Sequence, residues 1–177
     1  FTIPDSYIGN SIAVDDDGYI YVTTTLGLSY KLYKLTSAGT QAAAVSLLGA
    51  RSYMTIKQGR LYIPNGIDLE VYKTSDLSLD STISGVATET LKDVAFSPDG
   101  NVYAIFNDGV NIGVKKISTS MTTIVTGTTN IDGSIAIDRY ERIWVAYAPA
   151  AGSKSVRVYK ADGTLLESFF ESATDNT

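Results

Sequence analysis

One stretch near the start of the chain decides the fold. It reads Ser11-Ile12-Ala13-Val14-Asp15 and, two residues later, Gly18-Tyr19-Ile20-Tyr21-Val22. Related stretches begin at Ser52, Asp93 and Ser134, so the same pattern returns every 41 residues. An aromatic side chain keeps one place in all four copies, as Tyr21, Tyr62, Tyr103 and Trp144. A chain with such a fixed interval is built from repeated structural units.

Each repeat contains four short runs rich in Val, Ile, Tyr and Thr, which predict β-strands. Turn residues such as Asp16-Asp17-Gly18 and Pro98-Asp99-Gly100 separate the first two runs, and Gly accepts the positive φ that closes a hairpin. An apolar stripe of helical period is absent. A four-stranded antiparallel unit of about 40 to 45 residues is typical of a β-propeller blade. We therefore predict an all-β fold, a β-propeller with four repeats of about 41 residues. A β-solenoid fits less well, because its coils are shorter and have fewer hairpins.

The predicted domain covers residues 1–177, either as a whole propeller or as a segment of one. The repeats fall at about 11–51, 52–92, 93–133 and 134–174. Residues 1–10 are expected to supply an outer strand, which either closes the ring or belongs to a preceding blade. A larger propeller and a ring closed by two copies of the chain are both open alternatives.

The composition narrows the classes of function. The 177 residues include no Cys and no His, which excludes disulfides, thiolate metal sites and an imidazole base within this chain. The net charge is −5 and the sequence pI is about 4.6, which argues against a nucleic-acid partner. No apolar run approaches the roughly 18 residues of a membrane helix, so membrane insertion is not expected.

Three segments resemble known propeller repeats. Residues 12–22 and 96–103 are similar to the NHL-type and the lactonase-like (YVTN-type) repeats, as are the third-strand residues 158–163. The resemblance implies the propeller fold, but such propellers include hydrolases, binding platforms and sensors alike. Lactonase-like relatives hold a metal ion at the inner mouth with Glu, Asn and Asp side chains. The corresponding positions here offer one carboxylate, Asp93, which is therefore the candidate ligand for Ca²⁺.

The resemblance also implies where ligands bind. Propellers use the loops from second to third strand and from one blade to the next, and these loops vary here while the strands repeat. The candidate binding residues on this face are Asn10, Arg51, Asp68, Asp93, Asn107, Asp108 and Asp132.

Other recurring residues have a structural interpretation. The repeated aromatic residues are expected to pack between blades, where a large ring buries much area. The third-strand lysines are expected to keep an outer strand soluble and to discourage edge pairing. These are Lys34, Lys73, Lys116 and Lys160.

The sequence favours a non-catalytic binding or interaction propeller with no catalytic residue and no cofactor. Its expected setting is extracellular or on a cell or virion surface. Expected partners are a protein, a glycan or other subunits of an assembly, a homo-oligomer included, in which the chain would be a structural protein. The alternative is a metal-dependent, lactonase-like hydrolase on the same fold.

Overall fold

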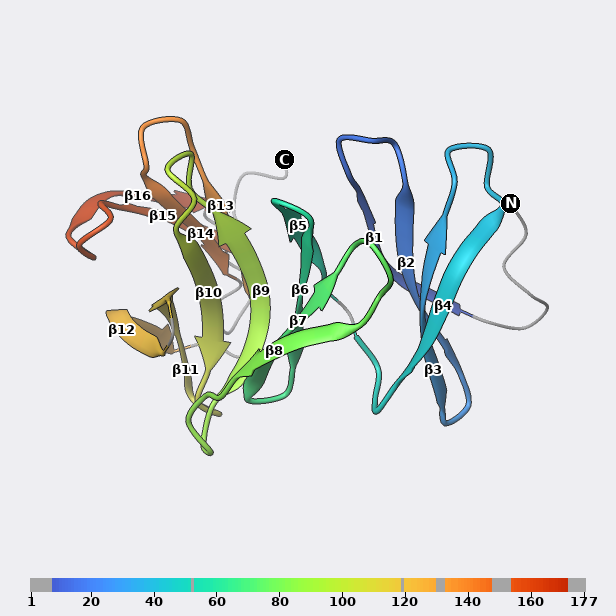
Figure 1. Cartoon of the computed structure of the whole chain (residues 1–177). Coiled ribbons are helices and arrows are strands. Elements are labelled where there is room, and N and C mark those ends of the chain that lie inside the picture. Colours follow the sequence, from blue (N-terminus) through green and yellow to red (C-terminus); the bar gives the residue numbers. More distant parts are fainter. Residues whose placement is uncertain (1–7, 52, 119, 130–132, 148–153, 172–177) are drawn as a thin grey trace, which may run out of the picture. The chain divides into compact units, whose positions relative to one another are not determined.

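The computed structural model describes residues 8–51, 53–118, 120–129, 133–147 and 154–171. These residues form four four-stranded sheets, each with its strands in chain order and antiparallel to their neighbours. Each sheet corresponds to one sequence repeat and is called a blade below (Figure 1). The predicted all-β fold with four-stranded antiparallel repeats is confirmed.

The chain divides into two compact units, and each is described by itself. Unit 1 (residues 1–83) contains blades 1 and 2. Blade 1 consists of β1 (Ile8–Val14), β2 (Ile20–Leu26), β3 (Ser29–Leu35) and β4 (Gln41–Leu47). Blade 2 consists of β5 (Thr55–Lys57), β6 (Arg60–Asn65), β7 (Asp68–Lys73) and β8 (Leu79–Ile83).

Unit 2 (residues 84–177) contains blades 3 and 4. Blade 3 consists of β9 (Thr90–Phe96), β10 (Val102–Asn107), β11 (Asn111–Ile117) and β12 (Met121–Thr129). Blade 4 consists of β13 (Gly133–Ile137), β14 (Ile143–Tyr147), β15 (Lys154–Tyr159) and β16 (Leu165–Glu171). Residues 1–7, where a further outer strand is expected, lie outside the described residues.

The described part of the chain contains no helix that could cross a membrane.

The turns between second and third strands are tighter than the sequence suggests. β2 continues through its threonines to Leu26, and β3 begins at Ser29, so only Gly27 and Leu28 connect them. Threonine is a good strand former, which explains why the ladder extends beyond the apolar run. Gly27 has a φ of +57°, which suits a residue without a Cβ atom.

The acidic stretch at the end of β1 forms the expected hairpin turn. Gly18 adopts a φ of +82°, and Asp15 Oδ1 accepts the backbone N–H of Tyr19 at 2.8 Å. Asp15 Oδ2 accepts the hydroxyl of Tyr21 at 2.8 Å. Burial, followed by this bond to Asp15, raises the pKa of Tyr21 above its usual range. Asp15 therefore ties a buried aromatic ring to its own turn.

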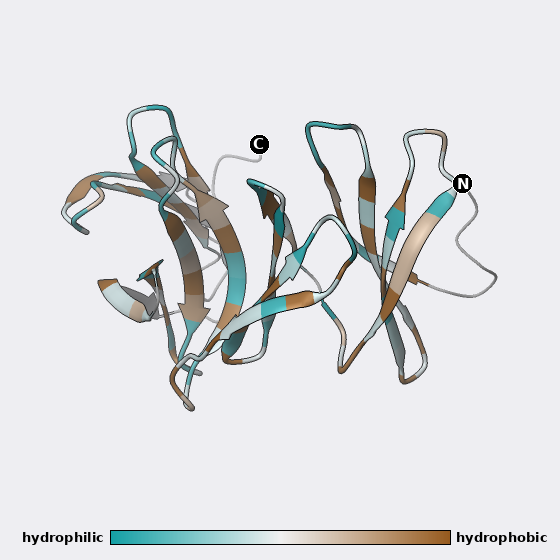
Figure 2. Cartoon of the chain, viewed as in Figure 1, coloured by the Kyte–Doolittle hydropathy of each residue, from teal (hydrophilic) through white to brown (hydrophobic). Residues whose placement is uncertain are grey.

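The core of unit 1 lies between its two blades. Tyr21 of β2 is fully buried and packs in one cluster with Leu61 and Ile63 of β6. Leu32 and Leu47 of blade 1 join the same cluster. The expected packing of Tyr21 between blades is confirmed. Figure 2 shows hydrophobic residues along the strands and hydrophilic residues in the turn that joins β1 to β2.

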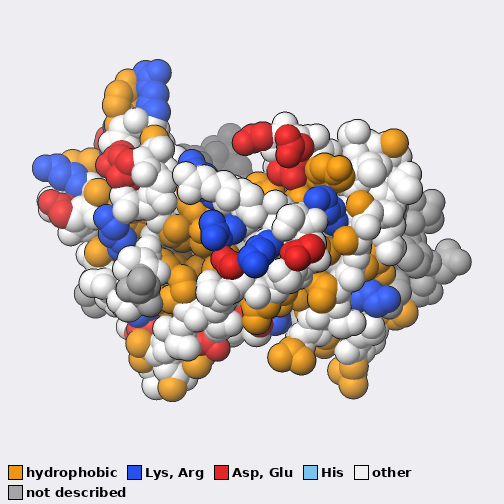
Figure 3. Space-filling view, viewed as in Figure 1, with side chains coloured by type: hydrophobic (Ala, Val, Ile, Leu, Met, Phe, Trp, Pro, Cys, Tyr) orange, Lys and Arg blue, Asp and Glu red, His pale blue; other side chains and the backbone are white. Residues whose placement is uncertain are grey.

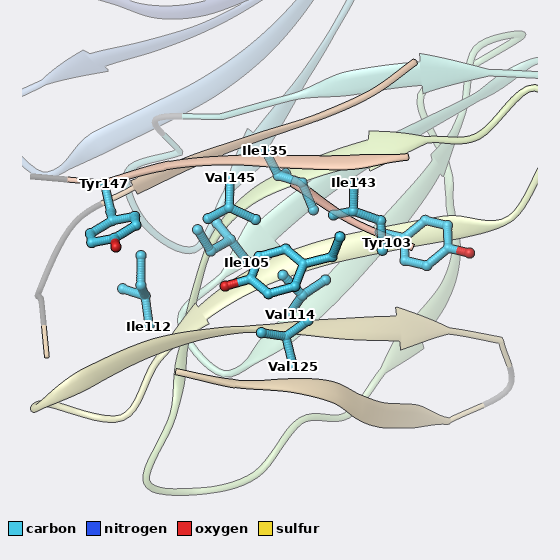
Figure 4. Close-up of a cluster of buried hydrophobic side chains, with 10 residues drawn as sticks. Tyr103, Ile105, Ile112, Val114, Val125, Ile135, Ile143, Val145 and Tyr147 are labelled. Atoms are coloured by element: carbon cyan, nitrogen blue, oxygen red, sulfur yellow. The ribbon is translucent and has the colours of Figure 1, made fainter. Parts of the chain in front are cut away.

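The core of unit 2 repeats this arrangement. Tyr103 and Ile105 of β10 pack against Ile135, Ile143 and Val145 of blade 4, with their side chains pointing toward one another (Figure 4). Tyr103 is 1% exposed, so it fills the place that Tyr21 fills in unit 1. One rule thus governs packing in both units: the aromatic residue of the second strand inserts against the following blade.

The third-strand lysines are less uniform than predicted. Lys34 Nζ donates to the carbonyl of Thr74 in blade 2 at 2.8 Å and lies 4.0 Å from the ring centroid of Tyr19. It bridges two blades, so the prediction of a purely solubilising role is wrong for Lys34. Lys73 is exposed and lies 3.7 Å from Asp80, as an outer-strand lysine should.

Candidate functional site

The predicted binding residues of unit 1 lie near one edge of its blades. This edge, called the loop edge below, is where the second strand turns into the third and the fourth strand leaves the blade. In blade 1, register brings Thr25, Tyr30 and Leu47 together there. Asn10 lies at a bulge of β1 beside this edge, and its Nδ2 donates to the hydroxyl of Thr25 at 2.6 Å. The amide of Asn10 is therefore held in one orientation.

Arg51, a predicted binding residue, is buried. Its side chain is 2% exposed, and Nη2 lies 3.2 Å from Glu70 Oε2 on β7. Glu70 also accepts hydrogen bonds from Asn65 Nδ2 at 2.6 Å and from the Tyr72 hydroxyl at 3.0 Å. The Arg51 backbone carbonyl accepts the hydroxyl of Thr23 at 2.8 Å. This polar cluster fixes the linker between blades 1 and 2 to the third strand of blade 2.

The polar cluster is a structural device rather than an open site. Burial, and then the negative charge of Glu70, raise the pKa of Tyr72 to about 12, so its hydroxyl remains a donor at neutral pH. Arg51 Nε and the buried Thr24 hydroxyl have no hydrogen-bond partner. A ligand could reach them only if the linker moved. Asp68 is the first residue of β7 and pairs with Asn65, a member of this cluster. Asp68 is half-buried.

In unit 2, Asp93 joins two blades. Its Oδ2 accepts the hydroxyl of Ser134 at 2.6 Å and the backbone N–H of Ile135 at 3.1 Å, both on β13. Its Oδ1 accepts the N–H of Val94 at 2.8 Å. Both carboxylate oxygens of the candidate metal ligand thus already bind donors. Among the described residues, no three acidic side chains gather where they could hold a metal ion. Asp132 lies outside the described residues.

Asn107 and Asp108 shape the loop edge of blade 3. Asn107 Oδ1 accepts the N–H of Gly109 at 2.5 Å. Asp108 Oδ1 accepts the N–H groups of Val110 at 2.9 Å and Asn111 at 2.7 Å. These backbone donors lower the pKa of Asp108 below its ordinary value. The turn is ordered by its own side chains, and Val110 at its tip is 60% exposed.

The binding residues predicted from the sequence are polar, but the loop edges also expose apolar residues that the sequence analysis did not predict. Leu28 in the turn of blade 1 is 92% exposed, and Leu48, just after β4, is 95% exposed. Val86, before β9, is about half exposed. Leu28 and Val110 each follow a glycine in a short turn. An apolar residue in such a turn could have predicted their exposure. Figure 3 shows hydrophobic side chains reaching the surface between scattered charged groups.

The structure brings predicted residues together only in part. Asn10 and Arg51 each bind partners that were not predicted, Thr25 and Glu70. Asp108 directly follows Asn107, and the two cap one turn. At the loop edges of the described chain, the arrangement therefore offers fixed amides, hydroxyls and carboxylates next to exposed aliphatic side chains.

No family model matches the chain, and no curated protein matches it in sequence. Solved structures do resemble it. A protein from Lactobacillus plantarum is 13% identical with a TM-score of 0.74, and the match covers 96% of this chain and 57% of that one. A protein of unknown function from Bacteroides caccae is 9% identical with a TM-score of 0.65, over 97% and 70% of the two chains. A luciferin-regenerating enzyme is 11% identical with a TM-score of 0.52, over 92% and 76%. At these identities the likeness shows the fold alone, and together with the four sheets it supports a β-propeller.

Proposed function

We propose that the chain is a non-catalytic interaction propeller whose loop edge binds a protein partner. The observation that carries this proposal is the near-complete exposure of Leu28 (92%) and Leu48 (95%) at the loop edge of blade 1. Protein interfaces combine an apolar centre with a polar rim. Here the apolar tips lie on the same edge as the ordered pair Asn10 and Thr25.

The order of these turns also favours binding. Asp108 and Asn107 hold the turn that carries Val110, so little conformational entropy remains to be lost when a partner docks. Aliphatic tips suit a protein surface better than a glycan, which needs hydrogen-bonding groups at the centre of the contact. The resemblance to NHL-type repeats is compatible with a binding platform. The low share of charged residues, 19%, is common on exported and virion-surface proteins.

The hydrolase alternative depends on Asp93. A bound cation would have to replace the donors from Ser134, Ile135 and Val94 that this carboxylate accepts. Carboxylate oxygens are ligands that Ca²⁺ prefers, but the ion takes six to eight oxygen ligands in all. A calcium titration followed by calorimetry distinguishes the two functions, because only the hydrolase requires saturable binding that Asp93→Asn abolishes.

The test of the proposal compares exposed leucines at opposite edges. The variant Leu28→Ser/Leu48→Ser should lose proteins that the immobilised wild type retains from an extract of its natural setting. The control Leu79→Ser removes a leucine that is 53% exposed at the start of β8 in blade 2, where it pairs with Tyr72, and this variant should retain them. Crosslinking through a photoreactive residue at position 28 then shows direct contact. Equal retention by all variants would refute the proposal, and binding on a glycan array alone would replace it with a lectin function.

A further inference from the structure

The turn between the first and second strands of blade 4 departs from the repeat pattern. The other three blades have a glycine at one place in this turn, and Gly18, Gly59 and Gly100 adopt φ values of +82°, +72° and +90°. Blade 4 has Glu141 at the matching place, with a φ of +62°. A residue with a Cβ atom is disfavoured in this region of φ. Strained positions of this kind cluster at functional sites, which makes the side chains of this turn candidates for a function.

The residue before Glu141 is an exposed aromatic side chain. Tyr140 is 63% exposed, whereas Tyr103, the second-strand aromatic residue of blade 3, is 1% exposed. The matching residues of the other three turns are polar: Asp17, Gln58 and Asp99. Tyr140 therefore adds little to a core and stands where the other repeats have a polar residue. Tyrosine is enriched at protein interfaces, because its ring is apolar and its hydroxyl binds polar groups.

Two arginines contact the ring of Tyr140. The guanidinium carbon of Arg139 lies 4.7 Å from the ring centroid, and that of Arg142 lies 5.4 Å from it. Arg139 Nη2 also donates to the Tyr140 hydroxyl, whereas Arg142 Nε pairs with Asp138 Oδ2 at 2.6 Å. Arg139 is exposed, and among the residues that the structure describes no carboxylate lies within ion-pair distance of it. Arg139 is thus the guanidinium group that a partner can bind.

Hydrogen bonds fix the conformation of this turn. Asp138 Oδ1 accepts the backbone N–H groups of Tyr140 at 2.9 Å and of Arg142 at 3.0 Å. The backbone N–H of Asp138 donates to the carbonyl of Arg142 at 3.1 Å, and that of Glu141 donates to the carbonyl of Asp138 at 3.0 Å. Figure 3 shows a basic and a hydrophobic side chain projecting from the surface where Figure 1 places this turn. A fixed, projecting turn loses little conformational entropy when it binds.

We propose that this turn, with Arg139 and Tyr140 at its tip, is a second interaction site that binds an acidic segment of a protein partner. Tyr and Arg are enriched among the residues that dominate binding energy at protein interfaces, and a guanidinium group binds a carboxylate through two parallel hydrogen bonds. Glu141 is half-buried, so the exposed groups at the tip are the cation and the aromatic ring. An acidic glycan fits less well, because guanidinium groups lie over the ring on which a sugar would stack. The turn lies at the opposite end of the second strand from the loop edge, so this site does not rest on the function proposed above.

Binding of a fluorescent hexaglutamate peptide tests the proposal. The wild type should bind this peptide at low ionic strength, where exposed charges are least screened, and Arg139→Gln or Tyr140→Ser should weaken the binding about tenfold or more. The control Lys73→Gln removes an exposed positive charge from blade 2 and should bind as the wild type does. A wild type that fails to bind, or an equal loss in Lys73→Gln, would overturn the proposal. Binding of dextran sulfate but not of hexaglutamate would overturn it in favour of an acidic glycan.

Crosslinking shows where the peptide binds, whatever the substitutions do to stability. Tyr140 and Leu28 are both exposed, so either position accepts a photoreactive residue. Such a residue at position 140 should crosslink to hexaglutamate, and at position 28 it should not. Equal crosslinking at the two positions would contradict the proposal. The variant Leu28→Ser/Leu48→Ser should bind hexaglutamate as the wild type does, so the loop-edge proposal and this one fail separately.

Discussion

At the scale of single residues, an aspartate between the first and second strands accepts a hydrogen bond from the aromatic residue of the second strand. Asp138 accepts Trp144 Nε1 at 3.0 Å and Arg142 Nε at 2.6 Å, and its other oxygen accepts two backbone N–H groups. Desolvation opposes its ionisation, but these donors prevail and hold the pKa of Asp138 far below its usual range. Asp15 does the same for Tyr21 in blade 1, at the matching repeat position.

These hydrogen bonds predict that Asp138 makes an acid-sensitive contribution to the stability of the fold. Its pKa is lowered by folding, so the carboxylate stabilises the fold above the unfolded value, about pH 4, and the contribution disappears as the pH falls below that. Asp138→Asn should therefore lower Tm at pH 7, and the difference from wild type should shrink between about pH 4 and pH 2. Thermal unfolding followed by Trp144 fluorescence measures this. Asp16→Asn, in the equivalent turn of blade 1 but exposed, serves as control. A difference in Tm that does not change with pH would show that Asp138 acts through the geometry of its hydrogen bonds and not through its charge.

At the scale of elements, buried ion pairs attach two of the linkers, those before blades 2 and 3, to the blade that follows. Arg51, before blade 2, pairs with Glu70 on β7 at 3.2 Å. Glu89, before blade 3, pairs with Lys115 on β11 at 2.7 Å. Glu70 and Lys115 occupy the same register, opposite Ile63 and Ala104 of the second strands. The charges are reversed between the two pairs, but the position is kept, which indicates that the linkage itself is the common feature.

Removing one partner of the buried Arg51–Glu70 pair should lower the stability of the fold strongly. Arg51→Met leaves Glu70 buried without its counter-charge, which should lower the free energy of unfolding by about 3–5 kcal/mol. The double variant Arg51→Met/Glu70→Met should recover much of that loss, because no uncompensated charge remains. The control is the exposed pair Arg60–Asp80 in the same blade, 2.8 Å apart, where Arg60→Met should cost at most about 1 kcal/mol. Urea unfolding measures all three, and equal effects at the two sites would contradict the argument.

The ion pairs also show which parts of this structure can be predicted from the sequence and which cannot. The strands follow from the 41-residue interval, because each blade must alternate strands and tight turns in the same way. The strand pairing of the structure, rather than the sequence, places Glu70, Lys115 and Arg157 at one register position. The partners of Glu70 and Lys115 could not be predicted either, since the linkers differ in length and place Arg51 and Glu89 at unequal distances along the chain. The loop-edge leucines escaped prediction for another reason: exposure is decided by the tightness of the Gly27-Leu28 turn, which the apolar pattern does not encode.

At the scale of the whole molecule, the two units contain the same interface once each. In both, the second-strand aromatic residue of one blade is buried against the next, as Tyr21 and Tyr103. Burying these aromatic side chains between neighbouring blades removes apolar surface from water, which is the main favourable term in folding.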